Sequence, residues 1–212
     1  MKISHSELEV CLRQPRGWLR EKLTTPSHAF KTGYNRALLL SIYNYHRTKQ
    51  TTVARQYLRD IIQRAQFKDL TRVDEIELAF ESYVRWCETE NVAVADSHIL
   101  IRFGSGYLTL VSEISRVDVT SDYYRAVLLG PFEPNWQTQL RMPLIQKAIS
   151  EKFARPVKEV SVSVQRLDGS NLQTRSYSMT ALARAERRFR DLAQRLQQYA
   201  RTFPAARVLA RE

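Results

Sequence analysis

The sequence predicts a mixed α/β (α+β) protein in which helices flank a central sheet of about four strands. Two observations predict this class. Apolar residues recur at helical spacing through residues 6–88, and between residues 92 and 170 they alternate with polar residues as in strands. Segregated runs of helices and strands are typical of the α+β class. The length of 212 residues suits one domain, so we expect residues 1–212 to fold as a single unit.

Two short helices are expected at the start of the chain. Ser6 and Glu9 have the spacing of a capping box, in which the serine caps the helix and the glutamate reaches back to the cap. This helix should end ahead of Pro15, because proline disfavours a helical conformation in the residue before it. The second short helix is predicted near residues 16–23.

Three longer helices are predicted next, and they form a helical elaboration, or insertion, at residues 27–91. Their ranges are 29–46, 51–66 and 71–88, and Thr71 is the predicted cap of the third helix. The outer face of this third helix is acidic, with Asp74, Glu75, Glu77, Glu81 and Glu88. We interpret it as a solvated face, with a surface for a partner protein as the alternative.

The predicted sheet core covers residues 92–170. Strands are expected at 99–103, 108–119, 124–129 and 157–167. Gly104 and Gly106 mark a hairpin turn between the first two strands, and a helix at 135–153 separates the last two. The third strand is almost continuously apolar, which favours a central place in the sheet.

An arginine-rich helix is predicted at residues 178–202. Leu182, Phe189 and Leu196 share its apolar face, and arginines crowd the other faces. A homodimer is one consequence of this pattern, because the basic helix of one copy could pair with the acidic helix of another.

Charge is the first indication of function. The chain has 33 basic and 22 acidic side chains, a net charge of +11, and its acidic excess is confined to the middle third. This distribution favours a surface for a polyanion such as DNA or RNA, with plain solubility as the alternative. No apolar run is long enough to span a membrane. Cys11 and Cys87 are the only cysteines, which favours a reducing cytoplasm over a disulfide scaffold.

Four segments resemble the RecB-type nuclease domains of the PD-(D/E)XK superfamily. They are residues 3–16 (ISHSELEVCLRQPR), 112–118 (SEISRVD), 124–131 (YRAVLLGP) and 136–148, the last of which contains Gln139. The resemblance spans most of the chain and rests on pattern rather than on one specific motif. It implies a restriction-endonuclease-like core of three strands, a helix and a fourth strand.

The resemblance also implies a metal site, and the chain departs from it. Family nucleases hold Mg²⁺ with carboxylates from two neighbouring strands, and a lysine assists the attacking water. The matching positions are Ser115, Leu128 and Gly130, and Arg36 lies near the expected place of an early histidine. Serine, leucine and glycine do not supply the two hard anionic ligands that Mg²⁺ needs. We therefore expect no catalytic residue, no metal and no cofactor in this register.

A displaced site is the alternative. Glu113 and Asp118 lie on the predicted second strand, and an active nuclease would use them to hold Mg²⁺ or Mn²⁺. Their positions differ by an odd number, so on a regular strand they would point to opposite faces and would share a metal only across a bulge.

The leading hypothesis is a catalytically inactive nuclease-fold protein, or pseudo-nuclease, that binds nucleic acid or serves as a structural subunit. The resemblance implies a bacterial defence, repair or CRISPR-type complex, with a helicase, an ATPase or an effector assembly as protein partner. A pure protein-interaction subunit is a further alternative. The residues expected to contact phosphate are Arg13, Arg16, Arg20, Lys22, Arg125, Arg141 and Lys147.

Overall fold

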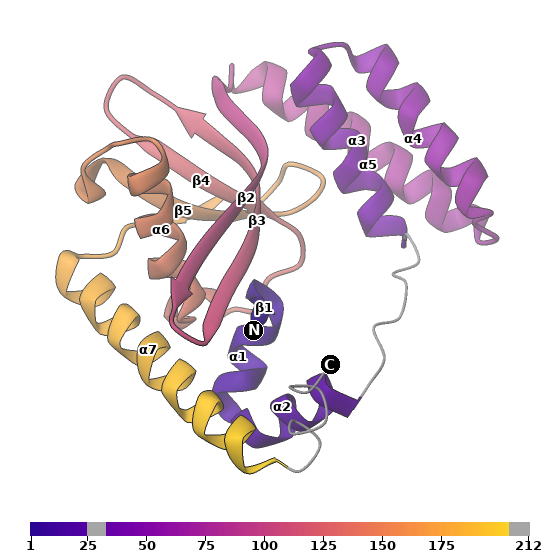
Figure 1. Cartoon of the computed structure of the whole chain (residues 1–212). Helices are drawn as coiled ribbons and strands as arrows, with labels where there is room; N and C mark the ends of the chain where they lie inside the picture. Colours follow the sequence, from indigo (N-terminus) through magenta and orange to yellow (C-terminus); the bar gives the residue numbers. More distant parts are fainter. Residues whose placement is uncertain (25–32, 204–212) are drawn as a thin grey trace.

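The computed structural model describes residues 1–24 and 33–203, and it is a mixed α/β fold in which helices lie on both sides of a twisted sheet (Figure 1). The strands are β1 (Lys2–Ser4), β2 (Val94–Ser105), β3 (Leu108–Val119), β4 (Tyr124–Leu129), β5 (Val160–Gln165) and β6 (Gln173–Arg175). The helices are α1 (His5–Arg13), α2 (Pro15–Thr24), α3 (Tyr34–Thr48), α4 (Thr51–Ala65), α5 (Leu70–Thr89), α6 (Arg141–Lys152) and α7 (Met179–Thr202). Short 3-10 turns at Trp136–Thr138 and Val157–Glu159 flank α6.

The sheet is built around β3. Its order is β1-β3-β4-β5-β6, and β2 pairs with β3 as well. β3 is antiparallel to β2 and β4, whereas β4 and β5 are parallel and are connected through α6. The fold class is confirmed, as are the four predicted strands, which correspond to β2–β5.

The sheet has six strands rather than about four in the part of the chain that the structure describes. The two additional strands, β1 and β6, have three residues each. A segment of that length is too short to show an alternating pattern, so pattern alone does not reveal it. Both lie outside the predicted sheet core of residues 92–170.

The capping box of α1 starts two residues earlier than predicted. Ser4, rather than Ser6, is the cap: its Oγ accepts from the Glu7 amide at 3.3 Å, and Glu7 accepts from the Ser4 amide at 2.8 Å. Both serines have a glutamate three residues later, so the spacing did not separate them. Strand β1 decides between them, because it holds Ser4 in the extended conformation that an N-cap requires.

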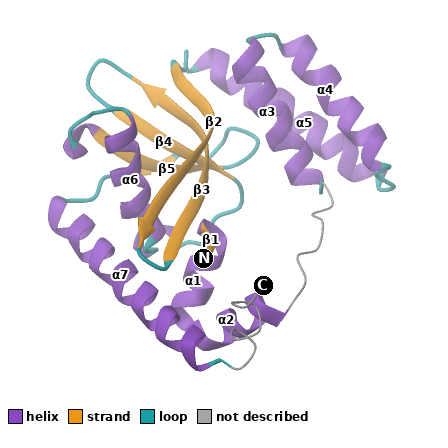
Figure 2. Cartoon of the chain, in the orientation of Figure 1, coloured by secondary structure: helices purple, strands orange, loops and turns teal. Residues whose placement is uncertain are grey.

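The helical layer α3–α5 covers one face of the sheet, and α6 and α7 lie on the other side (Figure 2). Alternate residues of β4 serve the two layers. Ala126 and Leu128 pack with α6, whereas Val127 and Leu129 pack with α3 and α5. This alternation is what a central strand requires, and it explains the nearly continuous apolar run of β4.

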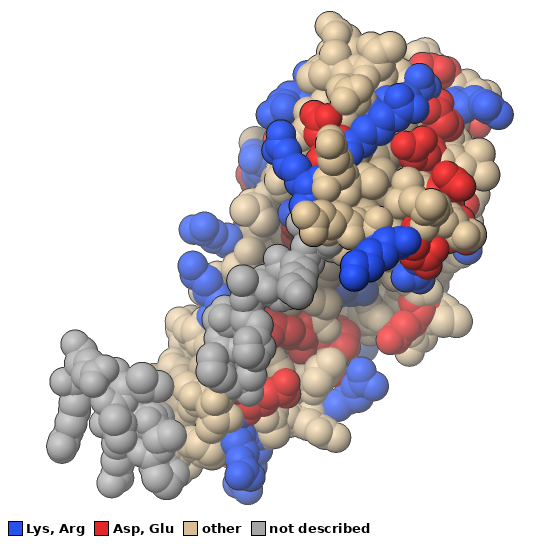
Figure 3. Space-filling view, turned by 90° about the vertical axis from the view of Figure 1, so that its right-hand side faces the viewer, with Lys and Arg blue, Asp and Glu red and all other residues tan. Residues whose placement is uncertain are grey.

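Asp69, rather than Thr71, caps α5, and it accepts from the Arg72 amide at 3.2 Å. The acidic side of α5 is partly an ion-pair seam with α4 rather than a simply solvated face. Arg55 contacts Glu81 at 2.6 Å, and Arg59 contacts Glu77 at 3.5 Å. Figure 3 shows the result, with basic and acidic side chains interspersed over this part of the surface.

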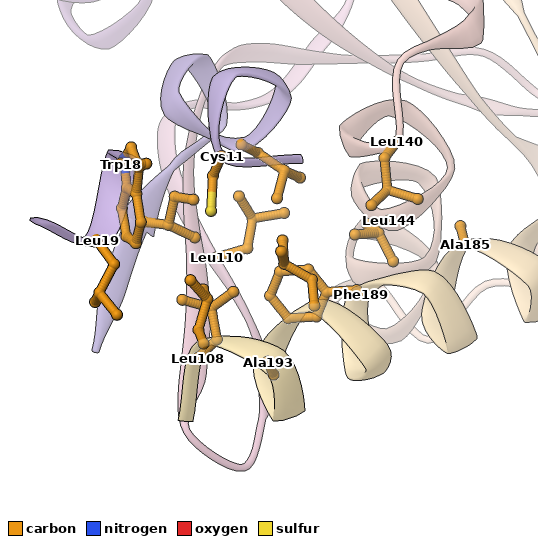
Figure 4. Close-up of a cluster of buried hydrophobic side chains, with 14 residues drawn as sticks. Cys11, Trp18, Leu19, Leu108, Leu110, Leu140, Leu144, Ala185, Phe189 and Ala193 are labelled. Atoms are coloured by element: carbon orange, nitrogen blue, oxygen red, sulfur yellow. The ribbon is translucent and has the colours of Figure 1, made fainter. Parts of the chain in front are cut away.

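The arginine-rich helix α7 closes a third apolar cluster with α1, α2 and the start of β3. Phe189 of α7 meets Leu108 and Leu110 of β3, and Trp18 of α2 is buried in the same cluster (Figure 4). The predicted start of α3 before residue 33 lies outside the described residues. Within residues 1–24 and 33–203, no helix combines the length and apolarity needed to cross a membrane.

Candidate functional site

A cavity of about 410 Å³ opens where the end of β4 meets α1, α3 and β3. The three family positions Ser115, Leu128 and Gly130 all line it, as does Glu113. The residues that share this cavity also include His5, Arg13, Arg36, Tyr43, Gln139 and Arg141. Residues from five separate segments therefore meet at one place, and we call it the β4 cavity.

Glu113 is held from three sides. It accepts from Arg36 Nη1 at 2.6 Å and from the Tyr43 hydroxyl at 2.8 Å, and His98 Nε2 lies 3.4 Å from the same oxygen. Burial works to raise the pKa of Glu113, but the hydrogen bonds and charge of its neighbours outweigh burial and lower it. The carboxylate is therefore ionised and neutralised by Arg36.

The regular alternation of β3 is interrupted at Ser115. The Ser115 hydroxyl accepts from the Leu129 amide at 3.0 Å, at the point where regular β3–β4 pairing has ended with Arg116 and Val127. On β2, His98 lies across from Ser115 and has a φ of +54°. Because of this irregularity, the residues on either side of Ser115 do not follow a strict two-residue period.

This irregularity turns Glu113 and Asp118 toward the same helical layer, as the contacts show. Glu113 bonds to α3, and Asp118 bonds to Arg116, which contacts Tyr83 of α5. The opposite faces expected for a regular strand are therefore not observed. Five residues of strand nonetheless place the two Cα atoms about 16 Å apart, so the two carboxylates do not share one metal ion.

Asp118 belongs to a sealed network. Arg116 Nε donates to Asp118 at 2.6 Å, and Arg125 contacts the second carboxylate oxygen at 2.9 Å. Arg116 also donates to the Tyr83 hydroxyl and to Gln165 Oε1, each at 2.7 Å, and its side chain is 0% exposed. Burial works to lower the pKa of Arg116, but the neighbouring Tyr83 and Asp118 raise it above its usual value. Asp118 is not among the residues that line the β4 cavity.

Arg141 lines the β4 cavity although it is 9% exposed as a residue. Its Nε donates to Gln139 Oε1 at 2.7 Å, and no carboxylate of the described residues forms an ion pair with it. Burial lowers its pKa, against the charges of Glu9 and Glu133, which line the same cavity. The neighbouring His5 stays neutral, because burial and the charge of Arg141 lower its pKa to about 4. A buried arginine without an anionic partner provides a site for an anion.

Two of the seven predicted phosphate contacts line the cavity, and two others lie on α2. Arg13 and Arg141 line the cavity. Arg16 stands over the ring of Tyr199 at 4.6 Å, and Arg20 is exposed on α2. The structure thus brings Arg13 and Arg141 to one place and leaves Arg16 and Arg20 on the adjoining surface of α2.

The remaining three predicted contacts have carboxylate partners within the chain. Neutralised cations contribute less to phosphate binding than unpaired ones, so they are weaker candidates. They are Lys22 with Glu7 at 2.6 Å, Arg125 with Asp118 at 2.9 Å, and Lys147 with Glu151 and Glu186 at 3.0 Å each.

Sequence reasoning missed His5, Arg36 and Tyr43 as members of the site. Arg36 and Glu113 are 77 positions apart, and no spacing rule links positions that far apart. The only signal for Arg36 was its place near the histidine that the resemblance expects. His5 and Tyr43 gave no signal, because a histidine or tyrosine on an amphipathic helix is ordinarily a packing residue.

The cavity residues do not fit the Mg²⁺ that the resemblance implies. Ser115 is bonded to the backbone, Leu128 is apolar and Gly130 has no side chain. Glu113 remains as the strand carboxylate, and Arg36 neutralises it. No group of three or more His, Cys, Asp or Glu side chains is arranged to hold a metal within the residues that the structure describes.

Comparisons with known proteins support the fold. No protein-family model matches the chain, and no curated protein matches it. A solved Eubacterium rectale protein described as a candidate exonuclease matches 93% of this chain and 80% of its own, with a TM-score of 0.54 and 8% identity. A structure described as SSO0001 matches 88% of this chain and 84% of its own, with a TM-score of 0.32 and 9% identity. A TM-score this low does not indicate a shared fold. The first likeness shows a shared α/β fold.

Proposed function

We propose that this chain binds nucleic acid through its phosphates at the β4 cavity and does not cleave it. The observation that carries the proposal is Arg141, a buried cation in the cavity wall without a carboxylate partner. A buried charge that lacks a partner is costly, and a phosphate oxygen would supply the partner.

Nucleic acid fits this site better than a small anion does. The net charge of +11 favours a polyanion. Arg13 lines the same cavity, and Arg20 is exposed on the neighbouring helix α2. More than one cation matches a ligand that carries several phosphates. The fold is also that of a protein described as a candidate exonuclease.

Two of the three family positions argue against cleavage. Leu128 is 3% exposed and packs in the apolar cluster around α6, so a carboxylate at this position would be buried in apolar surroundings. Gly130 has a φ of +150°, a conformation that L side chains rarely adopt, so a lysine here would be strained. The displaced-site alternative loses support, because Asp118 is sealed in the Arg116 network.

We also propose that the chain acts as a subunit of a larger bacterial nucleoprotein complex, with a helicase, an ATPase or an effector assembly as its partner. This setting rests on the resemblance to RecB-type domains, as does the proposed cytoplasmic location.

Fluorescence anisotropy with labelled single-stranded and duplex DNA tests the proposal. Affinity should fall steeply between about 50 and 200 mM salt, because each phosphate contact releases counterions. Arg141→Gln should weaken binding about tenfold, because a charge-assisted bond in a buried site is lost. Arg64→Gln, an exposed arginine on α4 away from the cavity, is the matched control and should change affinity less than about twofold. A flat salt dependence, or equal effects of the two variants, would overturn the proposal.

A further inference from the structure

A second and larger cavity, of about 620 Å³, lies beside the first. It is formed by the last part of α3, by Tyr57 of α4 and by the first residues of β2. Tyr43 lines both cavities, and His98 of this second cavity contacts Glu113 of the first. We call it the β2 cavity. Apart from Tyr43, the residues that line it are not those that line the β4 cavity.

Two cations without a carboxylate partner lie in the wall of the β2 cavity. Arg47 and Lys49 come from the end of α3, and neither forms an ion pair with a carboxylate of the described residues. Cations also stabilise the C-terminal end of a helix, which accounts for Arg47 in the last turn of α3. This effect does not require a second cation such as Lys49. Asp96 is the only carboxylate among the described residues that line the cavity. The balance favours an anionic ligand.

The same cavity presents aromatic rings. Tyr43 and His98 are stacked, with ring centroids 4.3 Å apart and an interplanar angle of 10°. Glu113 accepts a hydrogen bond from the Tyr43 hydroxyl and lies 3.4 Å from His98 Nε2, so it contacts both residues of the stack. Tyr57 adds a ring from the opposite helix. Flat rings of this kind provide stacking surfaces for a planar ligand.

Two polar atoms in the cavity residues have no hydrogen-bond partner. They are Oδ1 of Asn44 and Nδ1 of His46, whose residues are 7% and 6% exposed. Nε2 of His46 lies 2.8 Å from the Tyr83 hydroxyl, to which Arg116 also donates.

Burial lowers the pKa of His46 to about 3, so the ring is neutral at physiological pH. Asn44 Oδ1 and His46 Nδ1 are both buried atoms without a hydrogen-bond partner, so neither opens into the cavity.

We propose that the β2 cavity binds one nucleotide. Its phosphate would pair with Arg47 and Lys49, and its base would stack on the aromatic rings. Inorganic phosphate would leave the rings unused, and an apolar ligand would leave the cations unused. The ligand is either a free mononucleotide or an unpaired nucleotide within a strand.

The test compares two probes on the full chain: AMP, followed by calorimetry, and a labelled oligoadenylate of about 12 nucleotides, followed by anisotropy. The double variant Arg47→Ala/Lys49→Ala should lower affinity for at least one probe about tenfold. Tyr57→Leu should lower it about fivefold through lost stacking. Inorganic phosphate should compete far more weakly than AMP.

Arg64→Ala/Lys68→Ala removes the same two charge types from the exposed surface of α4 and the turn after it, and it serves as the matched control. Loss of AMP binding in the cavity variants supports a free nucleotide, and loss of oligoadenylate binding alone supports a nucleotide within a strand. If the cavity variants bind both probes as tightly as the control variant does, the inference is overturned. Arg141→Gln reports separately on the β4 cavity, so failure of one proposal is distinguishable from failure of the other.

Discussion

Strand β3 carries two carboxylate–arginine sites of similar chemistry in different surroundings. Asp118 lies under Arg116 and Arg125, and the Arg116 side chain is fully buried. Glu113 pairs with Arg36, whose side chain is 40% exposed at the wall of a cavity. The same pair of functional groups therefore builds a sealed structural network at one place and an accessible site five residues away.

The difference teaches that exposure, rather than residue type, separates structure from function on this strand. In the sealed network every charged group has a partner, so it has no capacity for a ligand. At the cavity, Arg141 lacks an anionic partner, and this unmet requirement is what a ligand can satisfy.

The largest expected effect is on the sealed network. Arg116→Met removes the cation that joins Asp118, Tyr83 and Gln165, and it should lower the free energy of unfolding by about 3–5 kcal/mol, because a buried carboxylate loses a partner. Urea unfolding followed by circular dichroism measures it. Arg36→Met at the open site should cost less than about 1 kcal/mol. Equal losses would remove the distinction between the two sites.

A pH series sharpens the same comparison, because a neutral histidine is buried beside each site. The pKa is about 3 for His46 and about 4 for His5, both below the value of about 6.5 in an unfolded chain. As pH falls below about 6.5, the histidines are protonated first in the unfolded state. The stability that is present above this pH is therefore lost progressively until the pH reaches the folded-state pKa values.

Each histidine should therefore lower the free energy of unfolding by about 2 kcal/mol between pH 6.5 and pH 5. Urea titrations at the two pH values measure this loss. His46→Gln should remove about half of the slope even though it lowers stability at pH 7. A slope that the variant leaves unchanged would show that the pKa of His46 is not depressed.

The smallest expected effect is that of Glu113→Gln. The pair with Arg36 is partly exposed, so stability should change by less than about 1 kcal/mol. Removing this negative charge frees Arg36, and affinity for single-stranded DNA should rise about threefold. Anisotropy at constant salt measures it. A drop in affinity would instead give Glu113 a direct part in binding.

Much of the fold was predictable from the sequence, because β2–β5 and the longer helices have strong periodic patterns. β1 was not, although it decides where α1 begins by holding Ser4 in an extended conformation. The resemblance pointed to Ser115, Leu128 and Gly130, and these positions meet at one cavity. The parity argument for Glu113 failed, because the irregularity at Ser115 depends on contacts with another strand.

The tertiary contacts of the site were beyond sequence reasoning for the same reason. Arg36 reaches Glu113 only after α3 packs against the sheet, and nothing local to either residue indicates the pairing. The isolation of Arg141 from carboxylates is likewise a property of the packed structure, although its residue type had marked it as a phosphate contact.

The central claim is that the β4 cavity holds nucleic acid without cutting it. End-labelled single- and double-stranded DNA incubated with the protein, in Mn²⁺ and in chelator, can be divided between a native gel and a denaturing gel. We predict a shifted band on the native gel and full-length DNA on the denaturing gel, with or without metal. Metal-dependent cutting that disappears in Glu113→Ala would contradict the claim and identify the chain as an active nuclease.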